Sequence, residues 1–372
     1  MKKFFALLIA FAIVLSTATS EADEELIEAS GEYVMDSRLD ETAASATARA
    51  REEAKRAAVE KAGVYLQSYS KMIDLVLEED EVQTVTAQLL KIQEETSSVE
   101  VVEKNLLKFT VTIKALINNL DEKTLKAIMN DRQSLDELIR KNKELQEKYD
   151  ALNRQMEKYR KDFDSVDDAK KIEIKKDVEH NTKKFYAINE FSKGNDFSFR
   201  KNFPRALATY DAAIELDPQF AEAYNNRGIV KYELGQISAA VEDYTAAVKL
   251  KSNYADALLN RGIAYAALEQ FQNAENDFRA ALKLNDKSAA AHNNLGSLFV
   301  FKEMFSEAVE ECTRAIRLNP NFADAWYNRA VAYYGLGDYS KALSDAQKSL
   351  QLNPNDRAAR ELYDRISRQS SR

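Results

Sequence analysis

The sequence is poor in the residues that interrupt helices and in those that carry out chemistry. Its 372 residues include only 9 glycines, 4 prolines, 1 cysteine and 2 histidines. Because glycine and proline mark turns, their scarcity predicts long helices and argues against a β-rich sandwich or barrel. One cysteine excludes an intrachain disulfide. So few imidazole and thiol groups argue against zinc, haem or iron–sulfur sites, and we expect no cofactor.

The charge balance is acidic, with 53 lysines and arginines against 61 aspartates and glutamates and a net charge of −8. Binding of nucleic acid relies on basic patches that neutralise phosphates, so we expect no nucleic-acid partner. The sequence also contains no nucleophile elbow, phosphate-binding loop or zinc-protease motif. We therefore expect a protein that is not an enzyme.

The first residues have the order of a secretory signal peptide. Two lysines precede an apolar run from Phe4 to Leu15, and small residues follow up to Ser20. The run is shorter than the roughly 20 residues that a membrane-spanning helix needs, although an uncleaved anchor is an alternative. We expect residues 1–20 to be removed, with cleavage after Ser20 or after Ala22. The mature chain, which has no later segment apolar enough to span a membrane, is then exported.

Residues 24–120 have the mixed pattern of a small α+β domain. A stretch rich in alanine, arginine and glutamate favours a long helix, and alternating apolar and polar residues are typical of a half-buried strand. The expected elements are a strand at Gly31–Met35, helices at Asp40–Gln67 and Asp80–Leu89, and a hairpin of Lys91–Val102 with Leu107–Ile117. Alanines at helical spacing in the long helix allow it to lie close against the sheet.

Three segments of this region carry a resemblance to known proteins. They are Gly31–Met35 (GEYVM), Arg51–Ser70 (REEAKRAAVEKAGVYLQSYS) and Asp80–Val82 ahead of Leu89. The region resembles the N-terminal domain of flagellar assembly protein T and the related domain of small bacterial outer-membrane lipoproteins. This chain departs from the lipoproteins because it has no cysteine after its apolar run. The resemblance implies a location in the cell envelope, either in the periplasm or at the outer membrane.

Residues 121–186 are strongly charged and contain no glycine or proline. Two mostly apolar series recur every seven residues, namely Leu135, Asn142, Tyr149, Met156 and Phe163, and Leu138, Leu145, Leu152, Tyr159 and Val166. This heptad pattern predicts a helical spacer that forms a coiled coil, and Asn142 is a residue type that fixes register in a homodimer. The alternative is an intrachain helical hairpin that turns at Asp164–Ser165, with a following helix covering the same stripe.

The C-terminal half repeats itself every 34 residues. Five frames align, at 187–220, 221–254, 255–288, 289–322 and 323–356, and 357–372 follows as a capping helix and tail. Position eight of the frames holds Gly194, Gly228, Gly262, Gly296 and Ala330, and position twenty-four holds Tyr210, Tyr244, Phe278, Cys312 and Ala346. The period and this pairing of small with large residues resemble the tetratricopeptide repeat.

The resemblance implies a mainly α fold in which the C-terminal half is a right-handed α-solenoid. Each unit consists of two antiparallel helices, and stacking is needed because one unit cannot bury its apolar faces alone. The first helices line a concave groove. Small residues at position eight let the two helix axes approach, and the large residue at position twenty-four fills the space beside them. Cys312, at such a packing position, is expected to be a buried, unreactive thiol.

The expected groove has an asparagine at position six in four successive repeats: Asn226, Asn260, Asn294 and Asn328. An amide both donates and accepts, so such a row can bond the backbone of an extended peptide. The apolar and aromatic residues expected beside it are Tyr232, Ile263, Phe301, Tyr327 and Tyr334. The alternative is that the asparagines bond neighbouring helices and hold the curvature.

Charged residues of the repeats refine this prediction. Acidic residues occupy position two, at Glu222, Asp256 and Asp324, and favour a neutral or basic peptide. Arginines at position seven, Arg227, Arg261 and Arg329, are expected to serve packing and salt bridges between helices. The sequence thus predicts an exported adaptor that binds a protein segment in the groove. The alternative is a structural component of a flagellar or secretion assembly that docks through its N-terminal domain.

Overall fold

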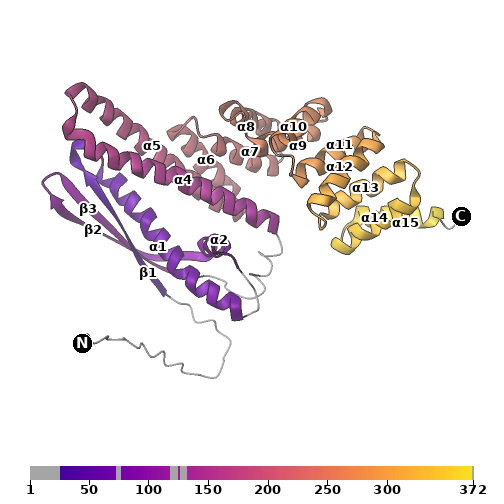
Figure 1. Ribbon diagram of the computed structural model, residues 1–372, viewed down its shortest axis with the longest axis horizontal. Helices are drawn as coiled ribbons and strands as arrows, with labels where there is room; N and C mark the ends of the chain where they lie inside the picture. Colours follow the sequence, from indigo (N-terminus) through magenta and orange to yellow (C-terminus); the bar gives the residue numbers. More distant parts are fainter. Residues whose placement is uncertain (1–25, 73–76, 118–124, 126–131, 371–372) are drawn as a thin grey trace, which may run out of the picture. The chain divides into compact units, whose positions relative to one another are not determined.

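A computed structural model gives the structure of the chain and describes residues 26–72, 77–117, 125 and 132–370 (Figure 1). The expected signal peptide, residues 1–20, lies outside this part, as does the beginning of the spacer. The described chain is mainly helical and divides into two compact units, residues 1–180 and 181–372. Among these residues, no helix combines the length and the apolar character that a membrane crossing requires.

A three-stranded antiparallel sheet forms the N-terminal unit together with its helices (Figure 1). The strands β1 (Leu26–Asp36), β2 (Leu90–Glu103) and β3 (Leu106–Ile117) lie in the order β1-β3-β2. Strand β3 buries every second residue from Phe109 to Ile117, which confirms the predicted half-buried strand. Strand β2 lies at the edge and is exposed from Lys91 onward.

Helix α1 (Ala43–Met72) covers one face of this sheet. Its alanines at helical spacing, from Ala50 to Ala62, include four with no exposed surface, which confirms the predicted small-residue stripe. The approach is so close that a Cβ atom at Gly31 would lie 2.1 Å from the backbone nitrogen of Ala54. Only glycine fits there, because any side chain meets the helix backbone. Helix α2 (Glu79–Leu89) lies where the second helix was expected.

The spacer residues form two helices, α4 (Arg132–Asp162) and α5 (Asp168–Phe199), joined by a short 3-10 turn at Phe163–Ser165. Met156 and Phe163 of the heptad stripe pack with residues of α5 in one buried cluster. The C-terminal end of the stripe therefore packs as the intrachain hairpin predicts, whereas Leu135 at its start is buried with Leu66 of α1 and Val82 of α2. Asn142, which a coiled coil would place at its interface, is exposed. The expected start of the first repeat, residue 187, falls inside the continuous helix α5.

The C-terminal unit continues with helices of 13 or 14 residues. They are α6 (Phe203–Leu216), α7 (Ala221–Glu233), α8 (Ile237–Leu250), α9 (Ala255–Ala267), α10 (Phe271–Leu284), α11 (Ala289–Phe301), α12 (Phe305–Leu318), α13 (Ala323–Gly335), α14 (Tyr339–Leu352) and α15 (Arg357–Ser370). Consecutive helices pack side by side, and every frame from 221 onward holds one pair (Figure 1). Leu362 and Ile366 of α15 are buried against the last helix pair, as expected for a capping helix.

Position eight packs against position twenty-four in each pair. A Cβ atom at Gly228 would lie 2.7 Å from the Tyr244 ring, and one at Gly262 would lie 2.6 Å from the Phe278 ring. In the fourth frame the neighbour of Gly296 is the thiol of Cys312. These contacts confirm that glycine at position eight lets the two helix axes approach, with the larger residue filling the space.

Candidate functional site

The position-six asparagines lie on the first helix of four successive repeats. Asn226 stands on α7, Asn260 on α9, Asn294 on α11 and Asn328 on α13, and all four are partly exposed. They occupy equivalent places because the helix pairs recur with the 34-residue period of the sequence. The chain therefore presents one amide from each of four repeats.

Three of these amides already donate a hydrogen bond to the preceding repeat. The pairs are Asn226 Nδ2 to Asn195 Oδ1 (2.8 Å), Asn260 Nδ2 to Asn225 Oδ1 (3.0 Å) and Asn328 Nδ2 to Asn293 Oδ1 (2.9 Å). The bonds join the first helices of adjacent repeats, which is the role that the alternative interpretation gave these residues. An amide nitrogen carries two hydrogens, so Asn260 and Asn328 each keep one N–H for another acceptor, whereas Asn226 also has a hydrogen bond with the Tyr210 hydroxyl.

Asn294 differs from the other three. The acceptor for Asn260 and for Asn328 stands 35 residues earlier, at position five of the preceding repeat. For Asn294 that position is Leu259, which has no polar side-chain atom. In the part of the chain that the structure describes, the Asn294 side chain makes no hydrogen bond. The Asn294 amide is therefore not bonded to a neighbouring repeat. This difference can be seen in the sequence only when positions five and six are read together.

The expected apolar residues are unequally exposed. Phe301 is the most exposed, with 65% of its surface open, and its ring lies tilted by 37° against Phe271 with 4.5 Å between centroids. Tyr334 contacts Tyr339, with 5.5 Å between ring centroids. Tyr232, Ile263 and Tyr327 are partly buried and pack against apolar clusters that each repeat shares with the next repeat or with the capping helix. Phe301 and Asn294 both belong to α11, so repeat four combines the most exposed of the expected apolar side chains with the asparagine that is not bonded to a neighbouring repeat.

The arginines at position seven pair within their repeats, as predicted. Each donates two hydrogen bonds to a buried aspartate of the second helix, for example Arg261 to Asp277 at 2.7 and 2.8 Å. The hydrogen bonds and charge of Asp277 raise the pKa of Arg261 above its ordinary value. These guanidinium groups hold helices together and are not available to bind a terminal carboxylate.

Cys312 and the two histidines occupy different surroundings. Burial raises the pKa of the Cys312 thiol to about 12, so it stays protonated and unreactive at neutral pH. His180 is exposed on α5. His292 is buried, and the distance between its Nδ1 and Glu311 Oε2 is 2.6 Å. The sequence did not predict this partner. The described residues contain no group of three or more His, Cys, Asp or Glu that could hold a metal ion.

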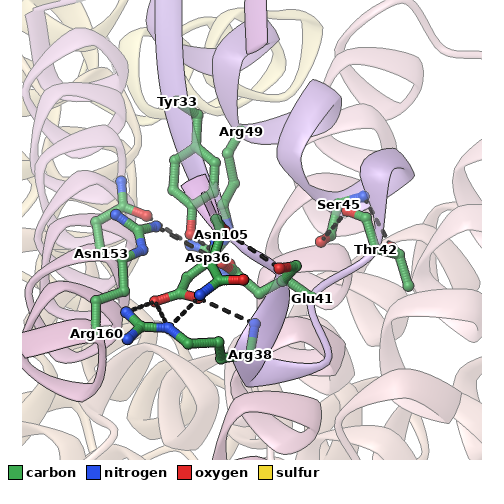
Figure 2. A network of polar contacts seen from close by, with 11 residues as sticks. Tyr33, Asp36, Arg38, Glu41, Thr42, Ser45, Arg49, Asn105, Asn153 and Arg160 are labelled. Atoms are coloured by element: carbon green, nitrogen blue, oxygen red, sulfur yellow. Dashed lines mark hydrogen bonds and ion pairs between the residues drawn. The ribbon is translucent and has the colours of Figure 1, made fainter. Parts of the chain in front are cut away.

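The N-terminal unit contains a buried polar network that the sequence did not reveal (Figure 2). Tyr33 donates a hydrogen bond to Glu41 Oε1 at 2.6 Å, and Glu41 Oε2 accepts one from the backbone nitrogen of Asp36 at 3.0 Å. The guanidinium groups of Arg160 and Arg49 lie 4.6 and 5.3 Å from the Tyr33 ring centroid. Burial raises the pKa of Tyr33, so this hydroxyl remains a donor.

The same network ties α4 to α1. Arg49 Nη1 donates to Asn153 Oδ1 at 2.6 Å, and Tyr149 donates to the backbone oxygen of Arg49 at 3.2 Å. Arg56 reaches Asp150 at 2.9 Å. Arg160 lies 3.8 Å from Glu41 Oε2, and its Nε and Nη2 atoms are buried without a hydrogen bond among the described residues. Because the hydrogen bonds and the ion pair above join α1 to α4, we assign the network a structural role.

Comparisons with protein families find repeats in the same half of the chain. The tetratricopeptide repeat model matches residues 255–288 and 323–356, a second tetratricopeptide repeat model matches residues 199–259, and a TPR repeat model matches residues 302–337. The first two ranges coincide with the third and fifth frames set from the sequence. No curated protein matches the chain.

Solved structures also resemble part of the chain. YrrB, described as a TPR protein with an unusual peptide-binding site, is 28% identical over 50% of this chain and 95% of its own, with a TM-score of 0.42. PilF of Pseudomonas aeruginosa is 20% identical over 51% of this chain and 86% of its own, with a TM-score of 0.47. MamA of Desulfovibrio magneticus RS-1 is 19% identical over 46% of this chain and 97% of its own, with a TM-score of 0.42.

Proposed function

Because residues 199–356 of this chain consist of tetratricopeptide repeats, we propose that it is an exported, non-catalytic adaptor or scaffold that binds a protein or peptide segment along the first helices of those repeats. The observation that carries the proposal is the row of partly exposed amides on α7, α9, α11 and α13. Within that row, the Asn294 side chain has no hydrogen bond to another described residue, and it stands on the same helix as the exposed Phe301.

The chemistry of this surface suits an extended segment with an apolar or aromatic side chain. The Asn294 amide can donate to a backbone carbonyl and accept from a backbone N–H. The Phe301 ring contacts Phe271 in a tilted arrangement, and its exposed surface can receive an apolar group.

Repeat four itself has Ala290 at position two, and Glu222 of repeat two is paired with Lys251 at 3.2 Å. Asp256 and Asp324, at position two of the repeats on either side of repeat four, favour a neutral or basic segment.

The binding test compares Asn294→Ala with Phe301→Ala. Crosslinking in the cell envelope followed by mass spectrometry identifies a partner, and its affinity is then measured with purified protein. Each variant should weaken binding about tenfold, since a lost hydrogen bond or apolar contact costs about 1–1.5 kcal/mol. Thermal melting of both should stay near wild type. Unchanged affinity in both variants would show that the partner binds elsewhere.

Export is the second part of the proposal. It is supported by the signal-peptide order of residues 1–20 and by the resemblance of residues 24–120 to envelope proteins. Fractionation should find the chain in the periplasm or at the outer membrane, and mass spectrometry of the purified protein should find Glu21 or Asp23 at its N-terminus. A cytoplasmic chain that retains Met1–Ser20 contradicts export while leaving the binding proposal standing.

A second candidate function is a structural role in an envelope assembly, with docking through the N-terminal unit. The observation that favours it is the edge strand β2, where Val99, Val101 and Val102 are 56%, 70% and 51% exposed. An extended segment of a partner can add to such an edge by backbone hydrogen bonds. Val99→Lys with Val101→Lys should then abolish partner capture, whereas Asn294→Ala should have no effect. The first candidate predicts the reverse.

A further inference from the structure

Three repeats share an ionic clamp between their two helices. Arg227 donates to Asp243 at 2.9 and 2.6 Å, Arg261 to Asp277 at 2.7 and 2.8 Å, and Arg329 to Asp345 at 2.7 and 3.0 Å. In every case the arginine is at position seven and the aspartate at position twenty-three. Arginine does not lose its proton in proteins, so these clamps keep their cation at every pH at which the fold exists.

Repeat four departs from this pattern at both positions. It has Leu295 at position seven and Glu311 at position twenty-three, so no arginine of α11 can clamp the second helix. His292, three residues before Leu295, makes the contact between the two helices in place of the arginine, with its Nδ1 2.6 Å from Glu311 Oε2. The two side chains are buried, with 7% and 12% of their surface exposed. The clamp of repeat four therefore depends on a group that can lose its proton.

The other ring nitrogen of His292 is also occupied. Its Nε2 lies 3.1 Å from the backbone oxygen of Asp286, in the turn between α10 and α11. A carboxylate and a carbonyl can only accept hydrogen bonds. Both contacts are therefore hydrogen bonds only when both ring nitrogens carry protons, which is the imidazolium form.

Charged groups around Glu311 keep its carboxylate ionised. Burial alone would raise the pKa of Glu311, but the hydrogen bond with His292 and the positive charges of His292, Arg314 and Arg279 outweigh burial and lower it. Arg314 of α12 lies 3.3 Å from Glu311 Oε1. The Glu311 carboxylate thus remains a charged acceptor over the pH range in which histidine side chains generally change charge. A charged acceptor forms a stronger hydrogen bond than a neutral one, so the carboxylate binds the Nδ1 proton more strongly than the Asp286 carbonyl binds the Nε2 proton.

We propose that His292 makes repeat four a protonation-dependent joint of the array. As imidazolium, it fastens α11 both to α12, through Glu311, and to the turn at residues 285–288, through the Asp286 carbonyl. When pH rises and one proton leaves, Nδ1–H remains on Glu311, and Nε2 presents a lone pair to the carbonyl oxygen. Two acceptors repel, so the contact opens and the turn between repeats three and four is released.

The direction with pH follows from these contacts. The stabilisation that His292 gives the turn is present while the imidazole is charged and is lost as pH rises through its deprotonation. The arginine clamps of repeats two, three and five do not change over the same interval. The joint therefore acts at one place in the array, and the inference does not depend on the proposed peptide binding.

The chain has only two histidines, which makes the test direct. His180 is exposed, so the full-length His180→Asn variant leaves His292 as the one imidazole of a folded protein. Nitrogen NMR of ¹⁵N-histidine, recorded from about pH 5 to about pH 9, should show two protonated ring nitrogens at the acidic end. At the alkaline end it should show a proton on Nδ1 alone.

Hydrogen exchange then shows what the proton controls. Amide protection at residues 285–288, corrected for intrinsic exchange, should fall about tenfold as His292 deprotonates, because one hydrogen bond is lost. The equivalent turn at residues 251–254, beside arginine-clamped repeats, serves as the internal control and should keep its protection. In His292→Gln, the protection at residues 285–288 should no longer vary with pH.

Two results would overturn the proposal. One is an imidazole that keeps the same protonation across the whole pH range. The other is amide protection at residues 285–288 that stays the same when His292 loses its proton. Should His292→Gln not fold, the spectra and exchange of His180→Asn decide the question alone, since both measure His292 in place.

Discussion

The amide nitrogen of Asn260 donates a hydrogen bond to Asn225 Oδ1 of the preceding repeat at 3.0 Å. The two residues stand on α9 and α7, so the bond joins the first helices of neighbouring repeats. A row of asparagines that looks uniform in the sequence therefore has two roles, since Asn260 holds the array together and Asn294 does not.

This division predicts different stabilities for two similar variants. Asn260→Ala should lower the free energy of unfolding by about 1 kcal/mol, because it removes the hydrogen bond and leaves Asn225 without its donor. Asn294→Ala, the matched control, should melt like the wild type. Thermal or urea unfolding of both measures the difference, and equal loss in the two variants would refute the assignment.

Glycine at position eight should resist substitution. In Gly228→Ala the new Cβ atom would lie 2.7 Å from the Tyr244 ring, so the helices must separate or the ring must move. We expect a loss of about 1–3 kcal/mol despite the higher helix propensity of alanine. Combining it with Tyr244→Leu should give a loss smaller than the sum of the two single losses. Strict additivity in urea unfolding would contradict the contact.

Position fifteen of the repeats adopts a left-handed backbone, and this predicts a stabilising change. Gly235 and Gly337 have φ values of 75° and 78° there, whereas Glu269 and Glu303 both have φ of 59°. A residue with a side chain is strained in this region, so Glu303→Gly should raise the free energy of unfolding by about 0.5–1 kcal/mol. Gly235→Ala, the reverse change, should lower it. A destabilised Glu303→Gly protein would show that the side chain matters more than the strain.

The helical spacer should not cause dimerisation. Met156 has no exposed surface and Phe163 is 7% exposed, because Ile174 and Val178 of α5 pack against them within the chain. Leu135, at the start of the same stripe, is buried in a cluster with residues of α1 and α2. A homodimer through this stripe would have to open the hairpin and expose its core. Sedimentation of the full-length protein at tens of micromolar should therefore find a monomer. A dimer that Met156→Lys dissociates without unfolding the chain would restore the coiled coil.

Much of the fold could be predicted because local periodicity encodes it. The alternation in Leu106–Ile117 and the alanines of α1 each specify a buried face through spacing alone. The glycines at position eight identified the contact with position twenty-four, because the period repeats it. In the spacer, periodicity identified the buried stripe but not its partner. A heptad stripe can be covered by a second chain, or, as here, by α1 and α2 at one end and by α5 at the other.

The sequence alone determined that the C-terminal half is a repeat array, because a fixed 34-residue period brings the same side chains to the same place in each helix pair. It could not determine which side chains remain open. The tertiary structure decided that, since Asn294 lacks the acceptor that Asn225 gives Asn260, and His292 meets Glu311 across two helices. Period and propensity act between neighbours in the chain, whereas a hydrogen bond depends on which atoms packing brings within about 3 Å.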